Sequence, residues 1–185
     1  MSAAVLDAGL VARARAASGK DREAACREIY ESLRPRVFRV CLQLCGERTL
    51  AEDAMQNAFL AAFRGLRTFR GDAQLSTWIY RVAIREALAL RARRAPAINL
   101  EHAESLPSPA APLDAQAAAR QQARAVQAAF RTLSAEHQAV LSLFAVEGLK
   151  HKQIAEVLGV PEGTVWYRLH EARKTLRAQV DHPTP

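Results

Sequence analysis

The amino-acid sequence predicts an all-helical protein in which a linker joins two small domains. Alanine, leucine, arginine and glutamate dominate its 185 residues, and no alternation of apolar and polar residues lasts long enough to indicate a β-strand. Four prolines, with no lysine or arginine, fall within residues 95–114, which predicts an extended linker. Residues 149–177 read as a short helix, a tight turn and a longer helix, the pattern of a helix-turn-helix.

Composition and charge narrow the classes of function. A chain that is 50% apolar and 24% charged is expected to fold rather than to remain disordered. The net charge of +7 and the pI near 9.9 indicate a polyanionic partner. The net charge is +7 over residues 1–95, −3 over 96–118 and +3 over 119–185. A second basic surface outside the helix-turn-helix is therefore expected.

Several classes of protein are not favoured by the sequence. No apolar run reaches the ~18–20 residues of a membrane span, and Asp7 lies where a signal peptide would be basic or apolar, so we expect a cytoplasmic protein without membrane insertion. Cys41 and Cys45, one helical turn apart, fit buried thiols better than half of a zinc site. No glycine-rich phosphate loop, HExxH motif or nucleophile elbow is present. We expect no catalytic residues, metal or cofactor.

The first half predicts a loose N-terminal helix and then a bundle. We expect helices over residues 4–17, 21–33, 35–45, 50–66 and 78–94. Pro35 fits the first turn of the third of these helices. Thr49 and Glu52 have the spacing of a capping box, and Ser76 or Thr77 can cap the last helix.

The second half predicts a helix over residues 113–131, another from an N-cap at Ser134 to residue 146, and then the helix-turn-helix. Gly159 falls at its turn, and Pro161 fits the start of the second helix. In that second helix one face is apolar: Val165, Leu169, Ala172 and Leu176. The opposite face and its flanks are polar and basic: Thr164, Tyr167, Arg168, Glu171, Arg173 and Lys174. An ordinary helical hairpin could have such a face, but a helix entering a DNA major groove explains it better.

The first half of the sequence contains two candidate binding surfaces. In the helix over residues 50–66, Asp53, Gln56, Asn57 and Leu60 share a polar face, and the leucine suits either contact with a partner helix or a common surface position. The following loop and helix combine aromatic and basic side chains, as single-stranded DNA requires: Phe69, Arg70, Trp78, Tyr80, Arg81, Arg85, Arg91, Arg93 and Arg94. Phe69 and Trp78 also fit a core, and the final arginines also suit a helix C-terminus.

Together, the two halves resemble the extracytoplasmic-function (ECF) subfamily of the sigma-70 family of bacterial RNA polymerase sigma factors. The first half carries AEDAMQ, FRG and a TW pair within residues 51–94, and the second carries the helix-turn-helix within residues 133–177. The resemblance implies an N-terminal extension (1–20), a region 2-like domain (21–94), a linker (95–114), a region 4-like domain (115–180) and a tail (181–185).

The resemblance implies a non-enzymatic function in transcription initiation. Expected partners are the RNA polymerase core (the coiled coil of its largest subunit and its flap), promoter DNA and an anti-sigma factor. Asp53 and Gln56 match the family motif for core binding, and Asn57 and Leu60 share their face. The aromatic and basic residues from Phe69 to Arg94 would bind the −10 element. The −35 element would meet Thr164, Trp166, Tyr167, Arg168, Glu171, Arg173 and Lys174.

The chain also departs from the family pattern. Asn57 replaces a frequent Glu, Arg85 a frequent Asn and Ala89 a frequent Asp. Trp166 and Tyr167 replace a Lys–Ser pair, and Glu171 replaces a base-facing Arg; the sequence therefore predicts an unusual −35 preference. Two alternatives remain: a stand-alone helix-turn-helix regulator, against which the lack of βα alternation argues, and a helical interaction module without DNA binding.

Overall fold

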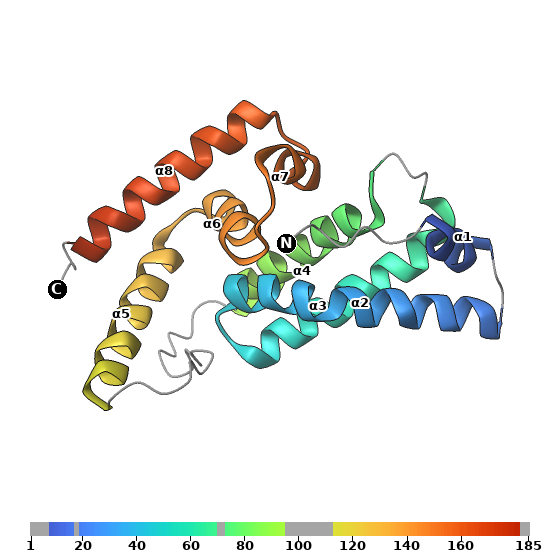
Figure 1. Cartoon of the computed structure of the whole chain (residues 1–185), viewed down its shortest axis with the longest axis horizontal. Coiled ribbons are helices and arrows are strands. Elements are labelled where there is room, and N and C mark those ends of the chain that lie inside the picture. The colour runs from blue at the N-terminus through green and yellow to red at the C-terminus, as the bar shows by residue number, and fades with distance from the viewer. Residues whose placement is uncertain (1–7, 17–18, 70–72, 95–112, 182–185) are drawn as a thin grey trace.

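The computed structural model describes residues 8–16, 19–69, 73–94 and 113–181, and every regular element among them is a helix. The predicted all-α class is thus confirmed. The helices form two bodies (Figure 1). The first contains α1 (Ala8–Ala16), α2 (Lys20–Cys45), α3 (Arg48–Gly65), the 3₁₀ turn η1 (Leu66–Thr68) and α4 (Leu75–Arg94). The second contains α5 (Leu113–Thr132), α6 (Ala135–Leu141), the π-helical turn η2 (Ser142–Val146), α7 (His151–Leu158) and α8 (Glu162–Asp181).

The first body is a three-helix bundle with a short helix across one end. Helices α2, α3 and α4 all pack on one another, and α1 packs on α2 and η1. Ile29, Leu33 and Ile79 are fully buried between the three long helices, and Tyr30 meets Phe59 edge to face at 4.8 Å. The apolar spacing of each helix therefore explains the bundle, because each buries one stripe.

Helix α2 runs without a break through Pro35, which corrects the prediction of two helices. Pro35 has no N–H, so the carbonyl of Glu31 loses its partner within the helix. Both residues are exposed, and water can solvate that carbonyl. On both sides of the proline, Leu33 and Val37 are buried, so packing on the bundle carries the helix through it.

The predicted helix starts in this body are also corrected. Helix α3 begins at Arg48 without a side-chain cap, and Glu52 pairs with Arg48 at 3.1 Å, so Thr49 and Glu52 do not form the predicted capping box. Helix α4 begins three residues earlier than expected. Ser76 and Thr77 therefore lie inside its first turn, where both are buried.

The second body follows its sequence signals more closely. Ser134 caps α6 as predicted, accepting a bond from the backbone N–H of His137 at 3.3 Å. Gly159 ends α7 in the left-handed conformation (φ 68°), as the turn requires. Of the predicted apolar face of α8, Val165, Leu169 and Ala172 are buried and Leu176 is half-buried.

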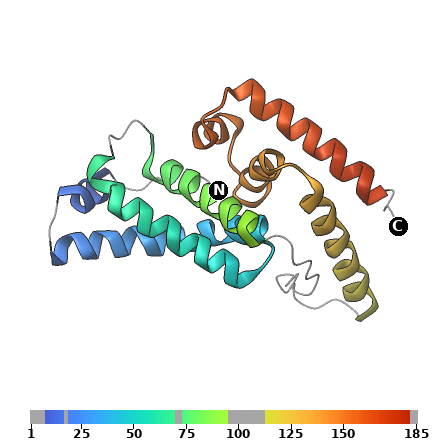
Figure 2. The ribbon, with the colours of Figure 1, turned by 180° about the vertical axis from the view of Figure 1, so that it is seen from behind.

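The two bodies are packed together, which the sequence did not predict. Helix α7 contacts α4, and η2 contacts α2. The two bodies lie side by side in both views (Figures 1 and 2). Most of the predicted linker, residues 95–112, lies outside the described residues, as do the ends 1–7 and 182–185. In the described part of the chain, no helix has the length and apolar character needed to span a membrane.

Candidate nucleic-acid interface

Helix α3 presents a polar face away from the core. Asp53, Gln56 and Asn57 are exposed, whereas Ala58 and Phe59 lie in the bundle. Leu60, on the same outward face, is 52% exposed. An apolar side chain among polar neighbours fits contact with a partner helix better than contact with DNA.

An aromatic pair lies beside the loop between η1 and α4. Phe69 stacks on Trp78 with ring centres 5.3 Å apart, and both side chains are half-buried. Trp78 also packs against Gly65, where a Cβ atom would lie 3.0 Å from the indole. The sequence allowed these two residues to lie either in the core or on a DNA-binding surface. In the structure they lie between the two, because each ring is partly packed and partly exposed. Arg70, predicted with them, lies outside the described residues.

Tyr80 and Arg81 of α4 are engaged by the second body. Tyr80 is 2% exposed, and its hydroxyl donates to the Glu147 carboxylate at 2.8 Å. Burial, and then the nearby carboxylate, raise the pKa of Tyr80. The guanidinium of Arg81 donates to the carbonyls of Glu156 (2.6 Å) and Val157 (3.0 Å) at the end of α7. A cation at a helix C-terminus is favourable because the unsatisfied carbonyls there are partly negative.

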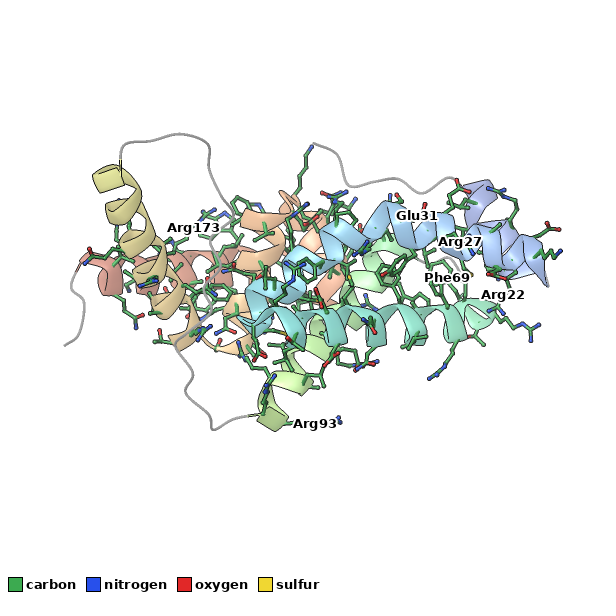
Figure 3. All side chains as sticks on the ribbon, turned by 90° about the horizontal axis from the view of Figure 1, so that it is seen from below. Arg22, Arg27, Glu31, Phe69, Arg93 and Arg173 are labelled. Atoms are coloured by element: carbon green, nitrogen blue, oxygen red, sulfur yellow. The ribbon has the colours of Figure 1, made fainter. Side chains whose placement is uncertain are left out.

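Some arginines of α4 bond to other groups of the protein, and others are exposed to solvent. Arg91 donates to the carbonyl of Leu44 at 2.9 Å and to the side-chain oxygen of Gln138, and burial lowers its pKa. Arg94 pairs with Glu47 at 2.9 Å. Arg93 projects from the exposed end of the helix (Figure 3). Arg85, nearer the middle, is exposed with a 3.5 Å contact to Glu86.

Helix α8 carries the most exposed aromatic side chains of the described chain. Trp166 and Tyr167 are 63% and 62% exposed. The indole of Trp166 lies parallel to the imidazole of His170, with ring centres 5.9 Å apart. Lys174 is also exposed, whereas Thr164 and Glu171 are half-buried at the edges of this face.

Two arginines of α8 that were predicted to meet the −35 element have partners within the second body. Arg168 pairs with Glu136 of α6 at 2.6 Å, and its side chain is only 18% exposed. The exposed Arg173 lies over the ring of Phe144, with its guanidinium carbon 4.6 Å from the ring centre. The Arg168–Glu136 ion pair therefore joins α8 to α6. The pattern of α8 alone could not show this contact, because Glu136 lies 32 positions away in sequence.

Sequence reasoning missed several of the side chains that join the two bodies. Glu147 accepts from Arg36 and Arg39 of α2 as well as from Tyr80. Gln138 of α6 accepts from Arg91. Glu147, Gln138, Arg36 and Arg39 belong to no local motif, so only the fold reveals them.

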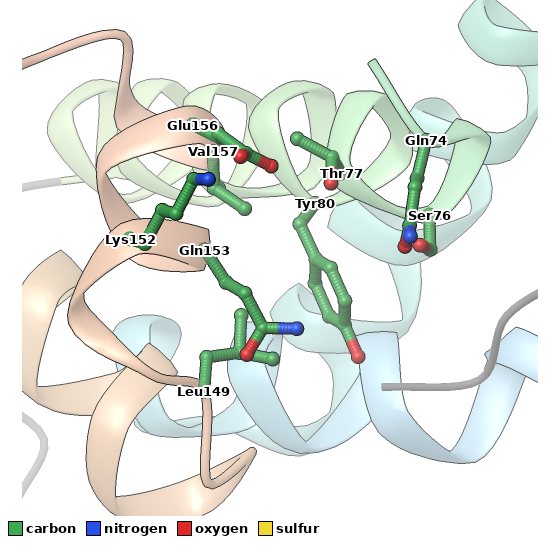
Figure 4. Close-up of a pocket in the computed structure, with 9 residues that line it drawn as sticks. All are labelled: Gln74, Ser76, Thr77, Tyr80, Leu149, Lys152, Gln153, Glu156 and Val157. Carbon is green, nitrogen blue, oxygen red and sulfur yellow. The ribbon is translucent and has the colours of Figure 1, made fainter. Parts of the chain in front are cut away.

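Three features bear on metal or ligand binding: the groups of titratable side chains, the buried cysteines and a cleft between the bodies. No group of three or more His, Cys, Asp or Glu side chains within the described ranges could hold a metal ion. Burial raises the pKa of the Cys45 thiol to about 12 and that of Cys41 as well, so neither is a thiolate at neutral pH. A cleft of about 230 Å³ lies between the start of α4 and α7 (Figure 4). Its walls belong to the contact between the two bodies.

Known proteins match both bodies. The sigma-70 region 2 family matches residues 29–96, and sigma-70 region 4 matches residues 123–176. The RNA polymerase sigma-H factor of Pseudomonas aeruginosa is 35% identical over 136 residues, covering 68% of this chain and 70% of that protein. The ECF sigma-E factor of Escherichia coli is 30% identical over 142 residues, covering 69% and 72%.

Solved structures show the same fold. CnrH, in complex with the cytosolic domain of CnrY, superposes with a TM-score of 0.71 at 21% identity, covering 95% of this chain and 97% of CnrH. The sigma factor RpoE of Bartonella quintana, in complex with the anti-sigma factor NepR, gives 0.64 at 18% identity, covering 85% and 98%. From its two matched regions and its identity with the sigma-H and ECF sigma-E factors, the chain belongs to the ECF subfamily of the sigma-70 family and is an RNA polymerase sigma factor.

Proposed function

We propose that this sigma factor binds the polymerase core through the outward face of α3 and reads promoters through two separate surfaces, one on each body. The observation that carries the proposal is that each matched region presents an exposed helix face suited to a different partner. On α3 the face combines Asp53, Gln56 and the exposed Leu60. On α8 it combines Trp166 and Tyr167.

The −10 surface centres on the Phe69–Trp78 pair. A half-buried, stacked pair beside a loop offers a flat apolar platform for an unstacked base, and base stacking on aromatic side chains contributes about 1–3 kcal/mol per base. Arg85 and Arg93 are exposed and suit backbone phosphates. Tyr80 and Arg81 would join them after the two bodies separate.

The −35 surface is the exposed face of α8. Trp166 and Tyr167 offer apolar area for thymine methyl groups, and Lys174 and Arg173 suit phosphates. Glu171 can accept a hydrogen bond from cytosine N4. The Glu171 carboxylate also repels nearby phosphates. The hydrogen bond to cytosine is therefore needed to offset that repulsion.

Glu171→Arg is expected to change the base preference at one or two −35 positions, with cytosine losing to guanine. Arginine donates two hydrogen bonds to guanine O6 and N7, and a good bidentate pair contributes about 1–3 kcal/mol of discrimination. The measurement is selection from promoters with a randomised −35 element, using polymerase reconstituted with each variant. Glu23→Arg, an equal charge change at an exposed position of α2, is the control and should keep the parental preference. An unchanged preference for Glu171→Arg would contradict this assignment.

An anti-sigma factor is the regulatory partner we propose. RpoE of Bartonella quintana, which shares the fold, is held in such a complex. The sigma factor acts where the polymerase transcribes, so the proposed location is the cytoplasm.

A further inference from the structure

Glu147 is a buried carboxylate whose side-chain partners all come from the other body. Its side chain is 0% exposed, and it accepts from Arg36 Nε at 2.7 Å, Arg39 Nη2 at 3.1 Å and Tyr80 Oη at 2.8 Å. Charge-assisted hydrogen bonds of this kind are about twice as strong as neutral ones. Both carboxylate oxygens are used, so the site is well satisfied.

The second body alone does not explain this burial. Glu147 directly follows the π-helical turn η2, and π-helical turns often occur at functional sites. Its hydrogen-bond partners lie 67 to 111 positions away in sequence, on α2 and α4. A carboxylate is costly to bury unless it is paired. Separating the bodies would therefore return Glu147 to water and release both arginines.

Other contacts across the same interface occupy groups proposed for promoter binding. Arg81 donates to two carbonyls at the end of α7, and Tyr80 is closed off under Glu147. Arg91 is bound to Gln138. Carboxylate and carbonyl oxygens thus take the donors that phosphate oxygens would take in a promoter complex. Tyr80 cannot reach DNA while Glu147 covers it, and two of the three guanidinium nitrogens of Arg81 are already occupied by α7.

We propose that Glu147 is an interdomain latch. Its carboxylate occupies Arg36, Arg39 and Tyr80 in place of nucleic-acid phosphates and keeps the chain closed until polymerase or promoter DNA separates the bodies. Arg36 and Arg39 then become part of the basic surface that meets the DNA backbone. The role in promoter binding rests on the proposed function above, whereas the closed state rests on the interface itself.

The closed state is tested by the distance between the bodies in the full-length chain. Fluorescent dyes are attached through E31C on α2 and R177C on α8, both exposed positions, in a Cys26→Ser background; Cys41 and Cys45 are buried. The variant Glu147→Gln keeps the size of the side chain and removes its charge. Losing charge-assisted bonds should lower the closed-to-open ratio about tenfold or more and lengthen the mean distance.

Two further variants make the distance test decisive. Glu136→Gln removes an ion pair that stays within the second body, so it should keep the parental distance. The double variant R36M/R39M removes the latch from the other side and should lengthen the distance as Glu147→Gln does. A parental distance in both latch variants, with unchanged helical circular dichroism, would overturn the latch.

Transcription separates this proposal from the proposed function. The concentration of sigma factor that gives half-maximal run-off transcription with core polymerase should fall up to about tenfold for an opened variant. The reason is that the free energy of opening no longer has to be supplied by binding. Lengthened distances without transcription by any variant would leave the latch standing and overturn the proposed function. If every variant transcribes as the parental protein does and the distance is unchanged, the proposed function stands and the latch is overturned.

Discussion

Leu60→Asp is expected to weaken binding of the chain to RNA polymerase core by about a hundredfold. Leu60 is 52% exposed on the face of α3 that also carries Asp53 and Gln56. Apolar anchors at the centre of an interface contribute about 2 kcal/mol or more, and a carboxylate placed in an apolar groove adds a cost of its own. Fluorescence anisotropy of labelled protein titrated with core polymerase measures the loss.

Val126→Asp is the matched control for this prediction. Val126 is also an exposed apolar side chain, 41% accessible, but it lies on α5 in the other body. The same chemical change there should alter core affinity by less than about threefold. Equal losses from the two variants would show that added charge, and not the α3 face, weakens binding.

Gln138→Leu is expected to destabilise the protein by about 3 kcal/mol, because it leaves buried carbonyls without a donor. Gln138 is fully buried, and its amide donates to the carbonyls of Phe130 and Leu133 at 2.9 Å and to that of Arg131 at 3.2 Å. Its own oxygen accepts from Arg91 in the other body. One side chain therefore closes the turn from α5 to α6 and joins the two bodies.

Thermal unfolding followed by circular dichroism measures this effect. A loss of that size corresponds to a fall in Tm of roughly 6–12 °C for a chain of this length. Gln127→Leu is the control: Gln127 is half-buried, with a 3.4 Å contact to Gln43, and its replacement should change Tm by no more than about 2 °C. A Tm for Gln138→Leu within that same margin would show that the three carbonyls find other donors.

The sequence predicted the helices well wherever local spacing decides them. The buried stripe of α8, the cap at Ser134 and the turn at Gly159 all follow from periodicity and backbone preference. Local rules failed where packing overrides them. Pro35 lies inside α2 because buried neighbours on both sides hold the helix, and Thr49 does not cap α3 because that helix begins one residue before it.

The surfaces were harder to predict than the helices. Exposure of Leu60 and Tyr167 agrees with their expected faces, and Trp166 is exposed beside Tyr167. Arg168 and Tyr80 instead find partners from helices distant in sequence, Glu136 and Glu147. Helical periodicity predicts the face of the helix on which a side chain lies. It does not predict which residues of a distant helix pack against that face.

Run-off transcription with purified core polymerase and a promoter pool is the most direct test of the central claim, that this chain initiates transcription through a two-surface promoter grip. The account predicts discrete transcripts only when chain and core are both present. It also predicts that they disappear with Leu60→Asp and shift to other promoters with Glu171→Arg. Transcripts that do not depend on the added chain, or tight duplex binding by the chain alone without any transcription, would contradict it.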